Sequence, residues 1–233
     1  MREALPRFLS AGPLAAGETV ALSPEEARHV RVRRLSDGTP VEVLDGRGLV
    51  GRGPLGSGGT SVLVESVEAG VGEPVARWTV ALAASEPSRV EWAVEKGTEC
   101  GAAGFLLFVA GRSQASCVRA LEGKLPRLAK VAVEAVKQCG RSIVPAVEGP
   151  VPFADLLGRR PSLVAVPGAP RWSAGTGEAA GSGGLIVVGP EGGLTPGERD
   201  ALVASGAIPF GLGPRVLRLE TAVVASLLAV SIG

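Results

Sequence analysis

GPEGGL at residues 189–194 and LGPRVLRLETA at residues 212–222 are the stretches that decide the fold of this chain. Each follows a short apolar segment that predicts a β-strand, at 185–188 and 207–210, and each precedes a predicted helix. Loops at the carboxyl ends of parallel strands are where open α/β sheets bind ligands. We therefore predict a ligand site at these two loops.

The glycines and the proline around Glu191 leave the main chain exposed. Backbone N–H and C=O groups in such a loop can hold a flat aromatic or sugar group. Thr195-Pro196-Gly197-Glu198 follows, and it has the pattern of a capping box with proline at the first helical position. A helix is therefore predicted to begin near Pro196, just beyond the loop.

A phosphate-binding loop is one alternative, because glycine-rich turns at helix N-termini attract anions. Here, however, Glu191 would set a carboxylate against the phosphates, and no Gly-Lys-Ser/Thr follows it. The spacing of Gly189, Gly192 and Gly193 also fails the dinucleotide-binding fingerprint. A tight turn without a ligand is the remaining alternative, and the presence of two such loops at neighbouring strand ends disfavours it.

Composition narrows the class of protein. The 233 residues allow two domains, and 45% hydrophobic residues are ample for a core. We expect a cytoplasmic protein without membrane association, because no apolar run reaches membrane-spanning length and the start lacks a secretory signal. The three widely spaced cysteines indicate buried thiols. With His29 as the single histidine, we expect no metal site and no histidine-based catalysis.

The pattern of elements changes near residue 72. Residues 1–72 carry short β-rich segments between turn-forming residues, which predicts a small β-barrel. These segments lie at 41–44, 49–53 and 61–67.

From residue 73 onward, apolar strands alternate with helices, which predicts an α/β fold with a parallel sheet. The strands are expected near 78–83, 105–110, 163–166 and 185–188. The helices are expected near 87–100, 126–139, 196–204 and 220–232. Residues 174–184 are rich in glycine and predict an insertion loop.

An arginine cluster marks the N-terminal part. Ser23-Pro24-Glu25-Glu26 has the capping-box pattern, and the helix it predicts carries Arg28, Arg31, Arg33 and Arg34 toward its end. A solvated helix face is the usual explanation of such a run. On a small barrel, the cluster also suits phosphate contacts, and the module resembles a PUA-like RNA-binding domain. Because the net charge is only +1, RNA would be held by such local clusters.

The two C-terminal stretches resemble the motifs of the trefoil-knotted (SPOUT) RNA methyltransferases, specifically the 16S ribosomal RNA uracil-3-methyltransferase family. Further agreement occurs at Lys96, Glu99, Arg112-Ser113, Glu134-Ala135, Gln138, Gly140 and Arg141, and at His29 with Arg33-Arg34. The resemblance implies a PUA-like β-barrel over 1–72 and a knotted SPOUT domain over 73–233. It also implies a homodimer that uses S-adenosylmethionine to methylate ring nitrogen 3 of a uridine in 16S rRNA, within the small ribosomal subunit. Composition and periodicity show no knot, and threaded chains are rare.

The resemblance also implies which residues hold the cofactor. We expect these contacts from Val166, Pro167, Gly189, Pro190, Glu191, Gly192, Gly193, Leu212, Gly213, Val216, Leu217, Leu219, Thr221 and Ala222. No metal is implied.

Methylation at this position of uracil raises a chemical requirement. Ring nitrogen 3 is mostly protonated at neutral pH, so the site must remove the proton or stabilise the resulting anion. Arg218 is the first candidate for a guanidinium beside the uracil carbonyl oxygens, with Arg141 and Arg112 next, and Arg112 is also expected to contact RNA. Glu191 or Glu220 could accept the proton, although Glu220 equally suits the start of the last helix.

Two other functions share these features. One is a non-catalytic RNA-binding or assembly protein that keeps the fold, and the other is a knotted methyltransferase that modifies transfer RNA. His29 is equally consistent with a structural role, and we assign it no part in catalysis.

Overall fold

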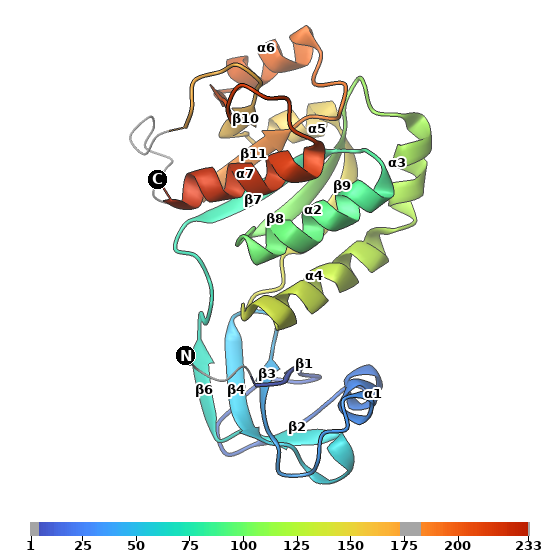
Figure 1. The fold of residues 1–233 in the computed structure, drawn as a ribbon, viewed down its shortest axis with the longest axis vertical. Helices are drawn as coiled ribbons and strands as arrows, with labels where there is room; N and C mark the ends of the chain where they lie inside the picture. The colour runs from blue at the N-terminus through green and yellow to red at the C-terminus, as the bar shows by residue number, and fades with distance from the viewer. Residues whose placement is uncertain (1–4, 173–182, 233) are drawn as a thin grey trace. The chain divides into compact units, whose positions relative to one another are not determined.

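The computed structural model describes residues 5–172 and 183–232 (Figure 1). The chain forms two compact units: unit 1 is Met1–Glu73 with Val136–Val144, and unit 2 is Pro74–Ala135 with Pro145–Gly233. Unit 1 thus includes a segment, residues 136–144, that the sequence pattern assigns to the second part. The predicted loop at 174–184 lies mostly outside the described residues.

Unit 1 consists of short strands and one helix. In chain order, they are β1 (Arg7–Leu9), β2 (Thr19–Ala21), α1 (Pro24–Val32), β3 (Pro40–Leu44), β4 (Leu49–Pro54), the 3-10 turn η1 (Ser57–Gly59), β5 (Ser61–Leu63) and β6 (Ser66–Ala69). Strands β1, β3, β4 and β6 form one sheet, whereas β2 and β5 form another. The β-rich segment predicted over 61–67 contains β5 and the start of β6, and the chain changes sheets between them.

The core of unit 1 follows from alternation along its strands. Val41 and Val43 of β3 are fully buried. Val62 and Val64, on the segment in and directly after β5, are also fully buried and belong to the same core cluster. Gly53 in β4 lets this segment approach, since a Cβ at residue 53 would overlap the carbonyl oxygen of Leu63. The strands β1 and β2 have three residues each, which is too short for an alternation pattern to predict them.

Unit 2 contains a six-stranded sheet whose neighbouring strands are all parallel. Its strands are β7 (Arg77–Ala83), β8 (Gly104–Val109), β9 (Ala146–Pro152), β10 (Leu163–Ala165), β11 (Gly183–Val188) and β12 (Ile208–Phe210). The predicted parallel α/β fold is confirmed. Strand β9 escapes prediction because a glutamate, a glycine and two prolines interrupt its apolar pattern.

Helices cover both faces of this sheet. They are α2 (Pro87–Glu99), α3 (Ala115–Glu122), α5 (Phe153–Gly158), α6 (Pro196–Ala204) and α7 (Leu219–Ile232), whereas α4 (Leu125–Cys139) begins in unit 2 and ends in unit 1. Helices α2 and α7 pack against each other over one face (Figure 1), where Gly97 of α2 lies against the ring of Phe105. Leu156 of α5 and Leu202 of α6 pack with Leu106. Because Phe105 and Leu106 are successive residues of β8, they point to opposite faces.

The strand order is β12-β10-β11-β7-β8-β9, so it reverses beside β7. Ligands in open α/β sheets bind beyond the carboxyl ends of the strands near such a reversal. One expectation needs correction here. The loops after β11 and β12 do not leave neighbouring strands, because β10 lies between them, and the loop after β10 is therefore central to any site.

Cys100, Cys117 and Cys139 form no disulfide bond and are half-buried, so they are less enclosed than expected. Among the helices of the described ranges, none has both the length and the apolar character needed to cross a membrane.

Candidate functional site

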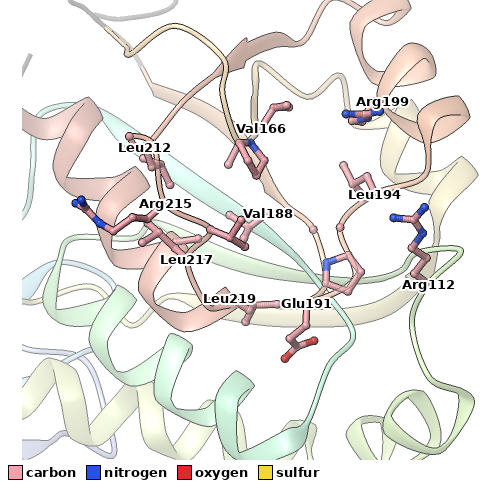
Figure 2. A pocket seen from close by; sticks show the side chains of 18 of the residues that line it. Arg112, Val166, Val188, Glu191, Leu194, Arg199, Leu212, Arg215, Leu217 and Leu219 are labelled. Carbon is pink, nitrogen blue, oxygen red and sulfur yellow. The ribbon is translucent and has the colours of Figure 1, made fainter.

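A cavity of about 320 Å³ lies at the carboxyl ends of β10, β11 and β12. This volume is within the range of small-molecule sites. Apolar side chains form much of its wall, with Val166 and Leu212 on one side and Val188, Leu217 and Leu219 on the other (Figure 2). Main-chain atoms of three glycine-containing loops complete it. The cavity therefore offers an apolar slot edged by backbone donors and acceptors.

The predicted cofactor residues converge on this cavity. All of them line it except Gly192 and Thr221. Residues that the sequence analysis did not assign to the cofactor also line it, namely Arg112, Ala165, Val188, Leu194, Pro196, Arg199 and Arg215. The sequence could have predicted Arg199 in the lining. It lies three residues after Pro196, so the two residues share one face of α6.

The first loop is shaped by its glycines. Gly193 has a φ of 69°, which favours glycine, and its N–H donates to the carbonyl oxygen of Pro190 at 2.7 Å. A Cβ on Gly189 would lie 3.0 Å from Cγ of Leu194, whose side chain is buried and anchors the loop. The sequence GPEGGL thus produces a tight turn that exposes its backbone toward the cavity.

Helix α6 begins at Pro196, directly after this loop. The Thr195 hydroxyl accepts from the Glu198 N–H, and the Glu198 carboxylate accepts from the Thr195 N–H, so the predicted capping box is confirmed. Burial alone would raise the pKa of Glu198. Hydrogen bonds from the amides of Gly111 and Thr195, a bond from the Thr195 hydroxyl and the charge of Arg112 outweigh burial and lower this pKa below its ordinary value.

The loops after β10 and β12 touch directly. The N–H of Gly211 donates to the carbonyl oxygen of Pro170 at 2.7 Å, and the N–H of Val166 donates to that of Phe210 at 2.9 Å. A Cβ on Gly211 would overlap the carbonyl oxygen of Ala169. The close contact between the loops after β10 and β12 therefore requires glycine at residue 211.

Charged side chains surround the cavity. Arg112, Arg199 and Arg215 line it together with Glu191, the one carboxylate in the part of the lining that the structure describes. Arg112 donates from Nη1 to the carbonyl oxygen of Gly192. The carboxylate of Glu191 points away from Val166 and Leu212 (Figure 2) and pairs with Arg89 at 3.5 Å. Glu191 therefore does not present a carboxylate to the cavity centre.

The other catalytic candidates of unit 2 lie beside the cavity. Arg218 is exposed and stands between the lining residues Leu217 and Leu219, without lining the cavity itself. Glu220 pairs with Arg89 at 3.3 Å, and its other oxygen is buried without a hydrogen-bond partner in the described part of the chain. Its position in the first turn of α7 agrees with the structural alternative for this residue.

Arg141 belongs to unit 1 and is buried there. It pairs with the carboxylate of Glu73, which also accepts from the amides of Ser142 and Ile143 at 2.8 Å each. Burial raises the pKa of Glu73, but these hydrogen bonds and the charge of Arg141 lower it by more, so its pKa lies below the ordinary value. The geometry favours a structural role for Arg141 over the catalytic role expected from the sequence.

The predicted RNA-contacting arginines of unit 1 are exposed. They are Arg28, Arg31, Arg33 and Arg34, on α1 and directly after it. Their exposure leaves the guanidinium groups accessible to a polyanion.

The start of α1, the helix that carries this cluster, differs from the predicted capping box. The Ser23 hydroxyl accepts from the Glu26 N–H, but the Glu26 carboxylate does not complete a capping box. It is buried instead, where it accepts from Nζ of Lys137 at 2.9 Å and lies 3.3 Å from Nδ1 of His29. A buried lysine is the stronger partner because an unpaired buried charge is costly. His29 thus has a structural contact.

Comparison with known proteins agrees with this arrangement. The model of an RNA methyltransferase domain matches residues 72–231. Ribosomal RNA small subunit methyltransferase E of Bacillus subtilis is 38% identical over 155 residues, which cover 61% of this chain and 60% of that protein. The protein of the same name from Mycobacterium bovis is 33% identical over 228 residues, which cover 93% of this chain and 87% of that protein.

Solved structures give the same result for the fold. The crystal structure of ribosomal RNA small subunit methyltransferase E from Neisseria gonorrhoeae, bound to S-adenosyl methionine, superposes with a TM-score of 0.85 at 26% identity. The superposition covers 97% of this chain and 96% of that one.

Proposed function

Because this chain belongs to the RNA methyltransferase family, among the relatives of ribosomal RNA small subunit methyltransferase E, we propose that it methylates ring nitrogen 3 of one uridine in 16S rRNA, with S-adenosylmethionine as donor. The observation that carries the proposal is the cavity formed by the loops after β10, β11 and β12. It lies at the position where parallel sheets bind ligands, and two sequence motifs typical of the family supply its walls.

The residues of the cavity fit this cofactor. An adenine ring suits the slot between Val166, Leu212 and Leu217, and polar edges of a nucleoside suit the backbone of the glycine loops. Bound S-adenosylmethionine would supply an activated methyl group, so this site needs no metal for that part of the chemistry.

The remaining task of the protein is to prepare the uracil. We assign the anion-stabilising role to Arg218, an exposed residue that lies in the sequence between the lining residues Leu217 and Leu219. A guanidinium stays charged at all relevant pH values, so it stabilises the deprotonated base without exchanging a proton itself. Glu191 is a weaker candidate for the base than the sequence suggests, because Arg89 engages its carboxylate.

Unit 1 is proposed to hold the RNA. The exposed cluster of Arg28, Arg31, Arg33 and Arg34 supports this role, since phosphate contacts need accessible guanidinium groups. Arg112, at the cavity edge, is proposed to contact the RNA beside the target base. The target must leave its stack to reach the cavity, which favours an unpaired or distorted site, and we place this reaction in the cytoplasm.

A homodimer is proposed as the working form. Helix α7 carries no charged residue after Glu220, and Leu228 on it is 43% exposed. Trp92 on the adjacent helix α2 is also 43% exposed. A helix that is apolar on all sides is normally covered, and a second copy of this chain would cover it. Sedimentation of the wild type against Leu228→Glu tests this: a dimer that persists in the variant contradicts the proposed surface.

The trefoil knot and the PUA-like barrel stay predictions of the resemblance. Support for a tightly interleaved C-terminal region comes from the contact of Gly211 with Ala169 and Pro170. Support for an RNA-binding barrel comes from the two small sheets of unit 1.

One experiment tests the proposed function. The purified protein is incubated with labelled S-adenosylmethionine and small ribosomal subunits, naked 16S rRNA or transfer RNA, and the nucleosides are analysed by mass spectrometry. We expect 3-methyluridine in 16S rRNA. Cofactor binding without transfer to any RNA would favour the non-catalytic alternative, and a methylated nucleoside in transfer RNA would favour the other methyltransferase.

A further inference from the structure

One arginine outside the cavity contacts three carboxylates. Arg89 lies in the first turn of α2, and its guanidinium is 3.4 Å from Glu86, 3.5 Å from Glu191 and 3.3 Å from Glu220. One of these carboxylates lies in a loop that builds the cavity, and another lies directly after such a loop. Glu191 belongs to the loop between β11 and α6, and Glu220 belongs to the first turn of α7, directly after the loop that follows β12.

Arg89 is the cation that these three carboxylates share, so the cluster is more strongly negative without it. Three carboxylates share one guanidinium, and one oxygen of Glu220 is already buried without a hydrogen-bond partner in the described ranges. If the guanidinium were absent, Glu191 and Glu220 would repel each other through a partly buried region. The loop that carries Glu191 would then move away from α7.

A second arginine holds the same loop. Arg112 donates to the carbonyl oxygen of Gly192, the residue next to Glu191. The turn at 189–194 therefore contacts two arginines, one through a side chain and the other through the main chain. Arg112 lines the cavity, whereas Arg89 does not.

We propose that Arg89 is a positioning residue, which holds the loop at 189–194 against the first turn of α7 and so sets the shape of the cofactor cavity. This inference rests on the proposed function for the identity of the ligand. The restraint of the loop at 189–194 by Arg89 does not depend on the ligand. The two parts can be tested separately.

An arginine is suited to this position because its planar group offers several donors in fixed directions, which can serve more than one carboxylate at once. A lysine provides one compact charge and cannot span the same three partners. The side chain of Arg89 is 28% exposed and that of Glu191 is 44% exposed, so solvent weakens each pair. The expected effect is therefore moderate.

The test compares Arg89→Gln and Arg89→Lys with Arg127→Gln. Arg127 is a matched control because it forms an exposed ion pair with Glu91 of the same helix α2, at 2.6 Å, away from the cavity lining. Hydrogen exchange of the 189–194 amides, above all the bonded amide of Gly193, is measured without ligand. The dissociation constant of S-adenosylmethionine is measured by calorimetry, and thermal unfolding reports the general loss of stability.

We expect Arg89→Gln to speed exchange at Gly193 and to weaken S-adenosylmethionine binding about tenfold, or about 1.4 kcal/mol. Arg89→Lys should fall between the wild type and Arg89→Gln, and Arg127→Gln should leave both measurements unchanged. In a Glu191→Gln background, Arg89→Gln should add little further loss, because the contact is already broken.

Unchanged exchange at Gly193 in Arg89→Gln would overturn the restraint, whatever the ligand. If Arg89→Gln weakens S-adenosylmethionine binding equally in the wild type and in the Glu191→Gln background, the assigned contact between Arg89 and Glu191 is wrong. A wild type that binds no S-adenosylmethionine would refute the proposed function, and the exchange measurement would still decide the role of Arg89.

Discussion

Glu198 and Gly111 are 87 residues apart in the sequence, yet Oε1 of Glu198 accepts a hydrogen bond from the Gly111 N–H at 2.7 Å. The other oxygen of the same carboxylate accepts from the Thr195 N–H at 2.8 Å. One side chain thus completes the cap of α6 and ties the loop after β8 to it. Because Arg112 follows Gly111, this contact also places Arg112 at the cavity.

We expect Glu198→Ala to destabilise unit 2 by about 1 to 2 kcal/mol, because it removes both a helix cap and a charged hydrogen bond to a loop amide. Urea unfolding measures the loss. Glu198→Gln keeps one oxygen acceptor and should lose less. Equal stabilities of Glu198→Ala and the wild type would show that the tether contributes nothing.

Arg218→Ala should reduce methyl transfer at least about a hundredfold, in keeping with the removal of an anion-stabilising donor. The dissociation constant of S-adenosylmethionine should change little, because Arg218 does not line the cavity. Single-turnover rates and calorimetry measure the two effects. A loss of cofactor affinity as large as the loss of rate would contradict this division of roles.

Gly211→Ala should abolish cofactor binding and destabilise unit 2, because the added Cβ overlaps the carbonyl oxygen of Ala169. Gly158→Ala is the matched control, since a Cβ at residue 158 meets nothing within 4 Å. Calorimetry and thermal unfolding of both variants provide the comparison. Normal binding by Gly211→Ala would mean that the loops after β10 and β12 need not touch.

Substitution of Arg31 and Arg33 by alanine should weaken RNA binding at all sequences alike. Each lost phosphate contact should lower the slope of log affinity against log salt by about one. Filter binding at several salt concentrations measures the slope, and Arg119→Ala on α3 of unit 2 is the control. An unchanged slope would identify the cluster as a merely solvated helix face.

Glu73→Gln should cost about 3 kcal/mol, because it removes the negative charge that pairs with the buried Arg141 guanidinium. The pKa of Glu73 is lower in the folded chain than in the unfolded one. Its stabilisation is therefore fully present above the ordinary glutamate pKa of about 4.3 and is lost as the pH falls through the lower folded value.

The measurement is urea unfolding of the wild type and Glu73→Gln between neutral pH and acid. Their difference in stability should shrink below the ordinary pKa. Glu65→Gln, an exposed change in the same unit, is the control for the general effect of replacing glutamate by glutamine. A constant difference across the pH range would mean that folding does not lower the pKa of Glu73.

Local sequence was sufficient for the elements that depend on neighbouring residues. The start of α6 follows from Thr195, Pro196 and Glu198, which satisfy each other within one turn. The strand β7 follows from its continuous apolar run, and the turn at 189–194 follows from its glycines. These features determined the parallel α/β class and most of the cavity lining, because hydrogen bonds and periodicity over a few residues specify them.

Contacts across long stretches of chain were decided only by the tertiary structure. The sequence does not reveal that β10 separates β11 from β12, or that Arg89 meets Glu220 across 131 residues. Nor does it reveal that Arg141 turns toward Glu73, or that Glu26 leaves its expected cap for Lys137. Which charged side chains pair depends on their burial and on the distance between them. The order of the strands in the sheet sets both, and no local sequence pattern specifies that order.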